Sequence, residues 1–167
     1  MGFDQPYSVA VEGLVFDADL NWILMRRGKQ ASDEVGKLEG IGGRVEDPLA
    51  CLRDELRREI VEEVGPEADI EILEFLEVKS DRVRKVDSRG RETFKTWVIV
   101  SFACLHRSGG LLIQEPEKNE GFEYVQDLKV APERLSSSCR QSLVMLQKAW
   151  PRISTRIKRE LTVNSPA

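Results

Sequence analysis

Apolar and polar residues alternate along the first part of the chain. Residues 8–16 follow this alternation, residues 17–21 are mostly polar, and residues 22–26 are again mainly apolar. Alternation with a period of two residues is typical of a half-buried strand, and a short polar segment between two such runs indicates a turn. The pattern therefore predicts a β-hairpin.

The middle of the chain has a different, helical period. Asp47 is a good helix cap, Pro48 suits the first helical position, and Gly65 followed by Pro66 ends a helix. Between these signals, apolar residues recur at helical spacing: Leu49, Leu52, Leu56, Ile60 and Val64. The sequence predicts a helix over residues 48–64, preceded by a glycine-rich loop over residues 36–43.

Further strands and one more helix follow. Apolar runs predict two strands over residues 70–78 and 94–105, and two short strands over residues 111–114 and 122–125. A helix is expected over about residues 136–150, with Pro151 as its end. We expect a mixed α/β layer fold. It should form a single domain over residues 1–167, with a core at about 7–150 and a C-terminal tail at about 151–167.

Composition narrows the class of protein. The 167 residues are 41% hydrophobic and 32% charged, with a net charge of -4, which disfavours disorder and a stable complex with nucleic acid. No window approaches the roughly 20 apolar residues of a membrane span. Three scattered cysteines, Cys51, Cys104 and Cys139, lack metal-ligand spacing. We expect a cytoplasmic protein that binds no membrane, and the sequence leaves a homodimer open.

Basic residues are concentrated between the two long predicted strands. Residues 79–95 contain seven basic and three acidic side chains. We interpret this segment as a long hairpin loop around Asp87, Ser88 and Gly90. Such a loop could bind the distal phosphates of a ligand, or it could be an ordinary solvated loop.

The predicted helix carries an acidic edge beside its apolar stripe. At about 100° per residue, four carboxylates fall within an arc of about 100°: Glu55, Glu59, Glu62 and Glu63. A solvated acidic face is one interpretation. A divalent cation is the other, because half-buried carboxylates repel one another. The nearby Gly42–Gly43 turn and Arg58, four residues before Glu62, favour the cation site.

These residues resemble a known family motif. Residues 58–65 read Arg, Glu, Ile, Val, Glu, Glu, Val and Gly. Together with Gly43 upstream, this run is similar to the Nudix box. The resemblance covers most of residues 7–126. It implies a Nudix-like α/β/α sandwich with a mixed sheet, and an enzyme that hydrolyses a pyrophosphate bond.

The resemblance also implies a metal site. Glu59 and Glu63 would ligate Mg²⁺, with Mn²⁺ as an alternative, and Glu62 would assist directly or through water. A backbone carbonyl of Gly42 or Gly43 would complete the protein ligands. Such a set suits Mg²⁺, which takes oxygen ligands and leans on substrate phosphates.

Further residues are candidates for roles outside the metal site. By the same resemblance, Arg58 would orient the glutamates. The family's loop glutamate is replaced by Leu49, and Glu46 is the candidate substitute. We assign Arg44, Glu46 and Trp97 as candidate substrate-binding residues. Trp97 would stack on a base, with core filling as the alternative.

A second segment is similar to part of the Nudix nucleoside triphosphate pyrophosphatases. Residues 115–124 resemble the stretch before the last core strand of that group. Glu117 and Glu120 are therefore the candidates for activating water, since this step needs a carboxylate near the attacking oxygen. A polar turn is the equally weighted alternative.

Two functions follow as hypotheses. The first is a magnesium-dependent hydrolase that cleaves the phosphoanhydride bond of a nucleoside diphosphate linked to another group, with nucleoside triphosphates as favoured substrates. The second is a catalytically weak Nudix-fold module that binds a nucleotide or a partner, suggested by the altered loop. For the hydrolase, the expected ligand is a small-molecule nucleotide substrate.

Overall fold

A computed structural model describes residues 7–86 and 89–163. Two long helices are present in these ranges, α1 (Leu52–Val64) and α2 (Ser137–Val163). The strands are β1 (Tyr7–Phe16), β2 (Trp22–Arg27), β3 (Leu38–Glu39), β4 (Ile41–Arg44), β5 (Asp69–Val86), β6 (Glu92–Ser108) and β7 (Asn119–Val125). The predicted opening hairpin is confirmed, while the glycine-rich segment expected as a loop contains the short strands β3 and β4.

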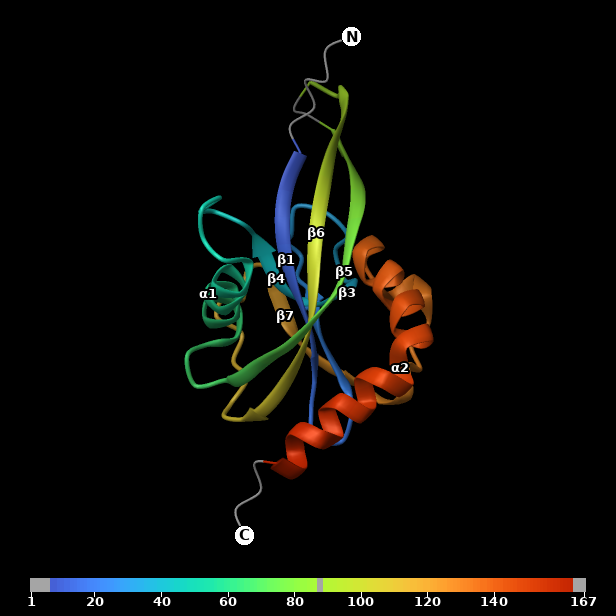
Figure 1. The fold of residues 1–167 in the computed structure, drawn as a ribbon. Coiled ribbons are helices and arrows are strands. Elements are labelled where there is room, and N and C mark those ends of the chain that lie inside the picture. The colour runs from blue at the N-terminus through green and yellow to red at the C-terminus, as the bar shows by residue number, and fades with distance from the viewer. Residues whose placement is uncertain (1–6, 87–88, 164–167) are drawn as a thin grey trace.

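The strands form one mixed sheet between two helical layers. Its order is β3-β2-β1-β6-β5, with β4 added on β1 and β7 on β2. β1 and β6 run parallel, and the other pairs are antiparallel. Figure 1 shows α1 on one side of the sheet and α2 on the other. The predicted mixed-sheet α/β/α sandwich is confirmed.

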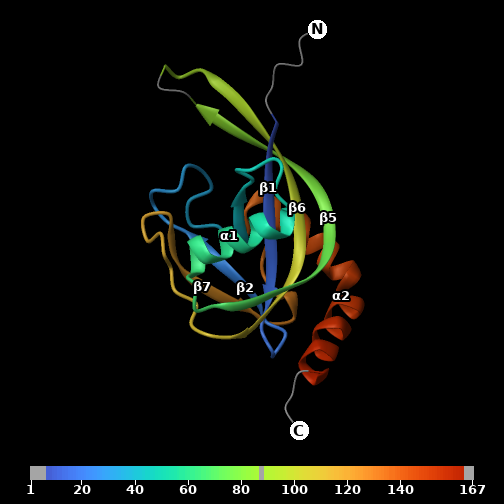
Figure 2. The same ribbon diagram turned by 60° about the vertical axis from the view of Figure 1, so that its left-hand side comes forward.

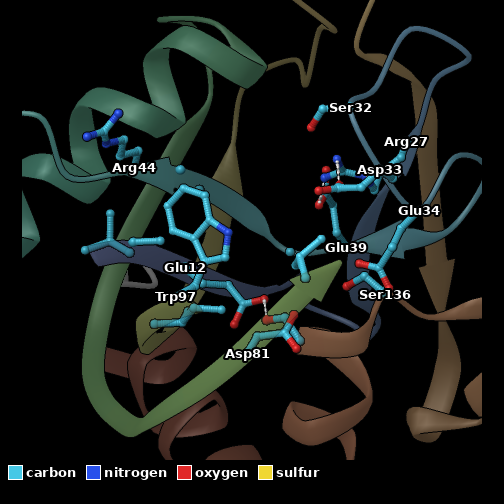
Figure 3. A pocket seen from close by; sticks show the side chains of 18 residues that line it. Glu12, Arg27, Ser32, Asp33, Glu34, Glu39, Arg44, Asp81, Trp97 and Ser136 are labelled. Atoms are coloured by element: carbon cyan, nitrogen blue, oxygen red, sulfur yellow. Dashed lines mark hydrogen bonds and ion pairs between the residues drawn. The ribbon is translucent and has the colours of Figure 1, made fainter. Parts of the chain in front are cut away.

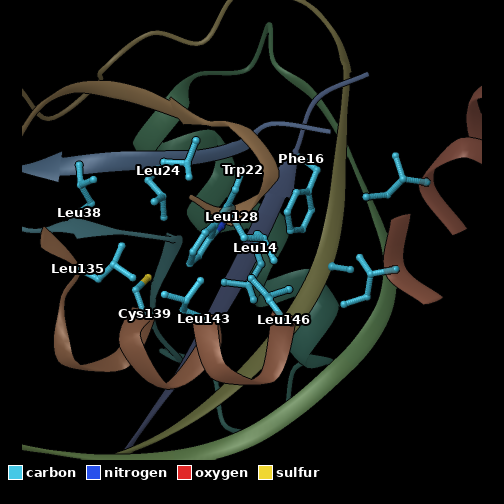
Figure 4. Close-up of a cluster of buried hydrophobic side chains, with 14 of the residues drawn as sticks. Leu14, Phe16, Trp22, Leu24, Leu38, Leu128, Leu135, Cys139, Leu143 and Leu146 are labelled. Atoms are coloured by element: carbon cyan, nitrogen blue, oxygen red, sulfur yellow. The ribbon is translucent and has the colours of Figure 1, made fainter. Parts of the chain in front are cut away.

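Each helix covers its own hydrophobic cluster. Side chains alternate along β1, so Leu14 and Phe16 face α2, whereas Val11 and Val15 face α1. The cluster below α2 is shown in Figure 4 and includes Trp22, Leu24, Leu38, Leu143 and Leu146. Both faces of β1 are therefore buried, one in each hydrophobic cluster.

The start of α1 differs from the prediction. The helix begins at Leu52, and residues 48–50 form a turn instead of a first helical turn. The Asp47 carboxylate accepts the Leu49 backbone N–H at 2.9 Å, and the Asp47 carbonyl accepts the Ala50 N–H. Asp47 therefore caps a local turn, a role that Asp performs as readily as a helix cap.

The basic segment is mostly a continuous strand ladder. β5 and β6 remain paired up to Val86 and Glu92, so the loop predicted over residues 79–95 is much shorter; Asp87 and Ser88 lie outside the described residues. Figure 2 shows β5 and β6 curling together beyond the rest of the sheet. Lys79 is buried and pairs with Glu12 at 2.6 Å. It therefore does not belong to a phosphate-binding loop.

Two other boundaries are corrected. Residues 111–114 form no strand, because the Leu112 and Gln114 amides donate to carbonyls at the end of α1. α2 continues through Pro151 to Val163, since Ile153 and Ile157 are buried in the cluster below it. Packing of this apolar stripe offsets the lost backbone bond. Neither helix in the described residues is long and apolar enough to cross a membrane.

Candidate active site

The Gly42–Gly43 segment, named the glycine turn from the sequence, is part of strand β4 and leaves no room for a side chain. A Cβ on Gly43 would lie 2.4 Å from a carboxylate oxygen of Glu59, and a Cβ on Gly42 would lie 2.1 Å from the Val11 carbonyl oxygen. The Gly42 N–H donates to the Glu63 carboxylate at 2.8 Å. Two predicted metal ligands are thus held directly against the backbone of β4.

Arg58 holds several carboxylates of α1 in place. Its Nη2 donates to Glu59 at 2.7 Å, to Glu55 at 3.0 Å and to the Arg44 carbonyl at 3.0 Å, while its Nη1 donates to Glu62 at 2.7 Å. Burial alone would lower the pKa of Arg58, but its carboxylate partners raise it. The geometry fits the orienting role expected for this arginine.

Glu55 belongs to the acidic edge predicted from the sequence, but the sequence analysis gave it no role in the site. Its carboxylate is buried and accepts the Glu46 backbone N–H at 2.9 Å as well as the Arg58 guanidinium. The backbone hydrogen bond from Glu46 and the contact with Arg58 lower the pKa of Glu55. Glu55 therefore ties the loop after β4 to α1. Its position four residues before Glu59 was the available signal.

Two of the predicted metal ligands have raised pKa values. Burial, followed by the charge of Glu39, raises the pKa of Glu63 well above its ordinary value. Burial also raises the pKa of Glu59, despite the Arg58 guanidinium. A divalent cation would relieve both the desolvation and the repulsion between these groups. The charge pattern of the site therefore suits a cation.

The carboxylate side chains of the site do not form a complete set of metal ligands. Within residues 7–86 and 89–163, no three acidic, histidine or cysteine side chains are arranged to hold an ion as they stand. The reason is visible in the contacts, because Glu59 and Glu62 turn toward Arg58 while Glu63 turns toward the Gly42 amide. The donor set still fits Mg²⁺, which is bound through few protein oxygens and keeps several waters.

The glutamates open onto a cleft. Its lining joins α1, the glycine turn and two loops, and includes Gly43, Arg44, Glu46, Glu59, Glu62, Glu63 and Glu115. Predicted residues from the β4 segment and from α1 are thus brought together. Glu117 and Glu120 are exposed and are not among the lining residues, whereas Glu115 from the same segment is. Glu115 also pairs with Lys118 at 2.5 Å.

A second cavity of about 210 Å³ continues from this cleft. The two share lining residues, among them Arg27, Glu39, Gly43 and Arg44. Figure 3 shows Trp97 in the second cavity, close to Glu12 and Asp81, with Glu39 and Arg27 on the opposite side. The predicted substrate-binding residue Trp97 is therefore separated from the acidic cleft but connected to it.

Comparisons with known proteins identify the family and the fold. The family model of the NUDIX domain matches residues 6–142. A MutT NUDIX hydrolase from Burkholderia pseudomallei has a similar structure, with a TM-score of 0.61 and 24% identity over 84% of this chain and 98% of that chain. None of the curated proteins matches this chain.

Two further solved structures show the same fold. A MutT protein from Methanosarcina mazei Go1 has a TM-score of 0.63 and 18% identity, over 88% of this chain and 97% of that chain. A NUDIX hydrolase from Nitrosomonas europaea has a TM-score of 0.60 and 12% identity, over 86% of this chain and 90% of that chain. Together with the family match, the box residues on α1 identify the chain as a member of the Nudix family, a Nudix pyrophosphohydrolase.

Proposed function

We propose that this protein is a magnesium-dependent hydrolase acting on a nucleoside diphosphate linked to another group, with nucleoside triphosphates as favoured substrates. The observation that carries the proposal is the contact of Glu59 and Glu63 with the glycine turn, at one end of a cleft that continues to Trp97. An elongated ligand can therefore lie with its phosphates at α1 and its base near Trp97.

The chain's own groups would divide the work of the acidic end. Glu59, Glu63 and the Gly43 carbonyl would hold Mg²⁺, with Glu62 assisting directly or through water. When bound, the cation supplies positive charge against the phosphoryl oxygens and acidifies water. Arg58 acts as a positioning residue, because its guanidinium holds Glu59 and Glu62.

Water activation needs a carboxylate near the attacking oxygen. Outside α1 and the β4 loop, the carboxyl groups that line the cleft are Glu39 and Glu115. Burial raises the pKa of Glu39 to about 7, even though Arg27 pairs with it. A pKa near neutrality suits a general base. We therefore place Glu39 first and Glu115 second for this role, ahead of the exposed Glu117 and Glu120.

The test is a hydrolysis assay with a panel of nucleoside triphosphates and nucleoside diphosphate-linked compounds. Release of phosphate or pyrophosphate should require added Mg²⁺ or Mn²⁺ and should stop in EDTA. Absence of release from every compound, with either metal present, would overturn the proposal. Glu39→Gln and Glu115→Gln then identify the base, since only its loss should abolish the acidic limb of the pH–rate profile.

A further inference from the structure

The cavity beside Trp97 contains a second acidic group from the opposite strand. Asp81 on β5 lies directly across from Trp97 on β6 in the strand register. Directly opposed residues project to the same face of a sheet, with Cβ atoms about 5 Å apart. Both side chains line the cavity, and Figure 3 shows them together on one side of it. An aromatic ring and a carboxylate thus face the same space.

Asp81 is only 7% exposed, and its two carboxylate oxygens differ. Its Oδ1 accepts the Ser137 hydroxyl at 2.7 Å and the Arg82 backbone N–H at 3.0 Å. Within the described residues, its Oδ2 accepts no hydrogen bond, and it is not sealed away from the cavity. A carboxylate oxygen this deeply placed is stabilised by a donor. The donor has to come from whatever fills the cavity.

The other buried carboxylate of this cavity is already satisfied. Glu12 accepts the Lys79 ammonium at 2.6 Å and the Ser101 hydroxyl at 2.8 Å, and it also contacts Ser142. Its charge is neutralised inside the protein. Of the two buried acids, Asp81 therefore has the oxygen that is directed to a ligand.

The walls of the cavity are fixed before any ligand arrives. The Lys95 ammonium lies 3.9 Å from the centroid of the Trp97 ring, which holds the indole in place. On the opposite rim, Glu34 accepts the Ser137 backbone N–H at 2.7 Å, and Asp33 pairs with Arg27 at 2.5 Å. The Trp97 ring and the Asp81 carboxylate beside it are therefore held in place before a ligand binds.

We propose that this cavity binds a nucleobase carrying an exocyclic amino group, with the ring against Trp97 and the amino N–H donated to Asp81 Oδ2. This inference rests on the proposed function, because it places the phosphates of the same ligand in the acidic cleft. Guanine, adenine and cytosine carry such an amino group, whereas hypoxanthine, unsubstituted purine and uracil lack it. Asp81 is thus the specificity-determining residue.

The test uses nucleoside monophosphates, which contain no phosphoanhydride bond. Binding is measured by calorimetry in EDTA for three pairs: GMP with IMP, AMP with purine riboside monophosphate, and CMP with UMP. In at least one pair, the amino-bearing member should bind roughly tenfold or more tightly, the effect expected for a hydrogen bond to a charged group. The pair with the largest ratio identifies the base.

Asp81→Asn should remove this preference. The amide oxygen can keep the bonds from Ser137 and Arg82, but an N–H₂ group then replaces Oδ2 and opposes an amino donor. The matched control is Asp69→Asn, an exposed position on the same strand, which should leave the ratio unchanged. Trp97→Leu should weaken both members of a pair without changing their ratio.

Three results would overturn the inference. They are equal affinity within all three pairs, no binding of any monophosphate, and an equal loss for both members of a pair in a folded Asp81→Asn variant. If that variant does not fold, the wild-type ratios together with Trp97→Leu decide. Hydrolysis of triphosphates without any base preference would contradict the amino-base site and leave the proposed function standing.

Discussion

The two ends of the cleft are built in different ways. The acidic end comes from β4 and α1, within residues 42–63, and its key contacts join the glycine turn to one helix. The cavity at the other end is assembled from β1, β5, β6, the loop before β3 and the start of α2. The proposed metal ligands therefore come from one short stretch of sequence, whereas the proposed base site depends on contacts between distant parts of the sequence.

A buried polar network holds the second end together. Lys79 from β5 pairs with Glu12 from β1, and both side chains are almost fully buried. Ser101 from β6 and Ser142 from α2 also contact Glu12. Although burial alone would raise the pKa of Glu12, the Lys79 ammonium and the hydrogen bond from Ser101 lower it. The network fixes the floor of the cavity beneath Asp81.

Breaking this network should have the largest effect. Lys79→Met leaves the Glu12 carboxylate buried without its cation, which should lower the free energy of unfolding by about 3–5 kcal/mol. Chemical denaturation measures this change. The double variant Glu12→Gln with Lys79→Met removes the stranded charge and should recover part of the stability. A loss below about 1 kcal/mol, as expected for the exposed control Lys29→Met, would contradict a structural role.

Substitutions at the acidic end should lower turnover without lowering the stability of the fold. Glu63→Gln removes a ligand charge at nearly constant size, so turnover should fall by about a hundredfold or more while nucleotide monophosphate binding stays intact. Steady-state kinetics with Mg²⁺ measures the first effect and calorimetry the second. Loss of the buried charge should leave the melting temperature equal or higher, because burial disfavours this carboxylate.

Glu67→Gln is the matched control for that variant. Glu67 is exposed, lies just after α1, and is not among the residues lining the cleft. It should keep wild-type turnover. Wild-type turnover in Glu63→Gln itself would mean that the cation is held elsewhere.

Arg58→Ala should have a smaller effect on turnover. Removing the guanidinium frees Glu59 and Glu62 from their present orientation, and we expect about a tenfold loss of kcat/KM, in the range for residues that orient metal ligands. Arg57→Ala provides the control, because Arg57 is exposed and pairs with Asp54 away from the cleft. If kcat/KM were equal in the Arg58→Ala and Arg57→Ala variants, Arg58 would not position the glutamates.

Local signals were enough to predict the first end of the cleft. The helical period and the box residues located Glu59, Glu62 and Glu63, and the neighbouring glycines marked the close approach of β4. The exact start of α1 was missed, because Asp47 and Pro48 favour a turn as well as a helix end. The sequence therefore identifies these residues, but it does not decide between a turn and a helix start at residues 47–50.

The cavity beside Trp97, which is the second end of the cleft, could be predicted only in part. Trp97 was assigned to substrate binding, but the sequence does not indicate that Asp81 lies opposite it, because this depends on the register of β5 and β6. Lys79 was grouped with the basic loop, since its charge gives no sign of the buried Glu12 that pairs with it. Pairing over 67 positions of sequence follows from the assembled sheet and not from local patterns.

The smallest predicted effect is a dependence of stability on pH. It differs between the two ends of the cleft, because the pKa values of Glu59 and Glu63 at one end and of Glu12 at the other are shifted in opposite directions. Burial raises the pKa of Glu63 and Glu59 and brings that of Glu39 to about 7, so the native state binds protons more tightly than the unfolded chain. In EDTA, the titration of Glu39 should therefore lower stability by about 1 kcal/mol as pH rises from about 6.5 to 8.5. Glu12 has a lowered pKa, so its contribution is lost only in the acid range, below this window.

Mg²⁺ should cancel this decline. The cation binds the ionised carboxylates, so its stabilising effect grows as pH rises and binding releases protons. Melting temperatures measured in EDTA and in Mg²⁺ across the window should diverge toward high pH. Because Glu63→Gln removes one of the titrating groups, the slope in EDTA should become shallower. If the curves of melting temperature against pH ran parallel in EDTA and Mg²⁺, the carboxyl groups with raised pKa values would not be the groups that bind the cation.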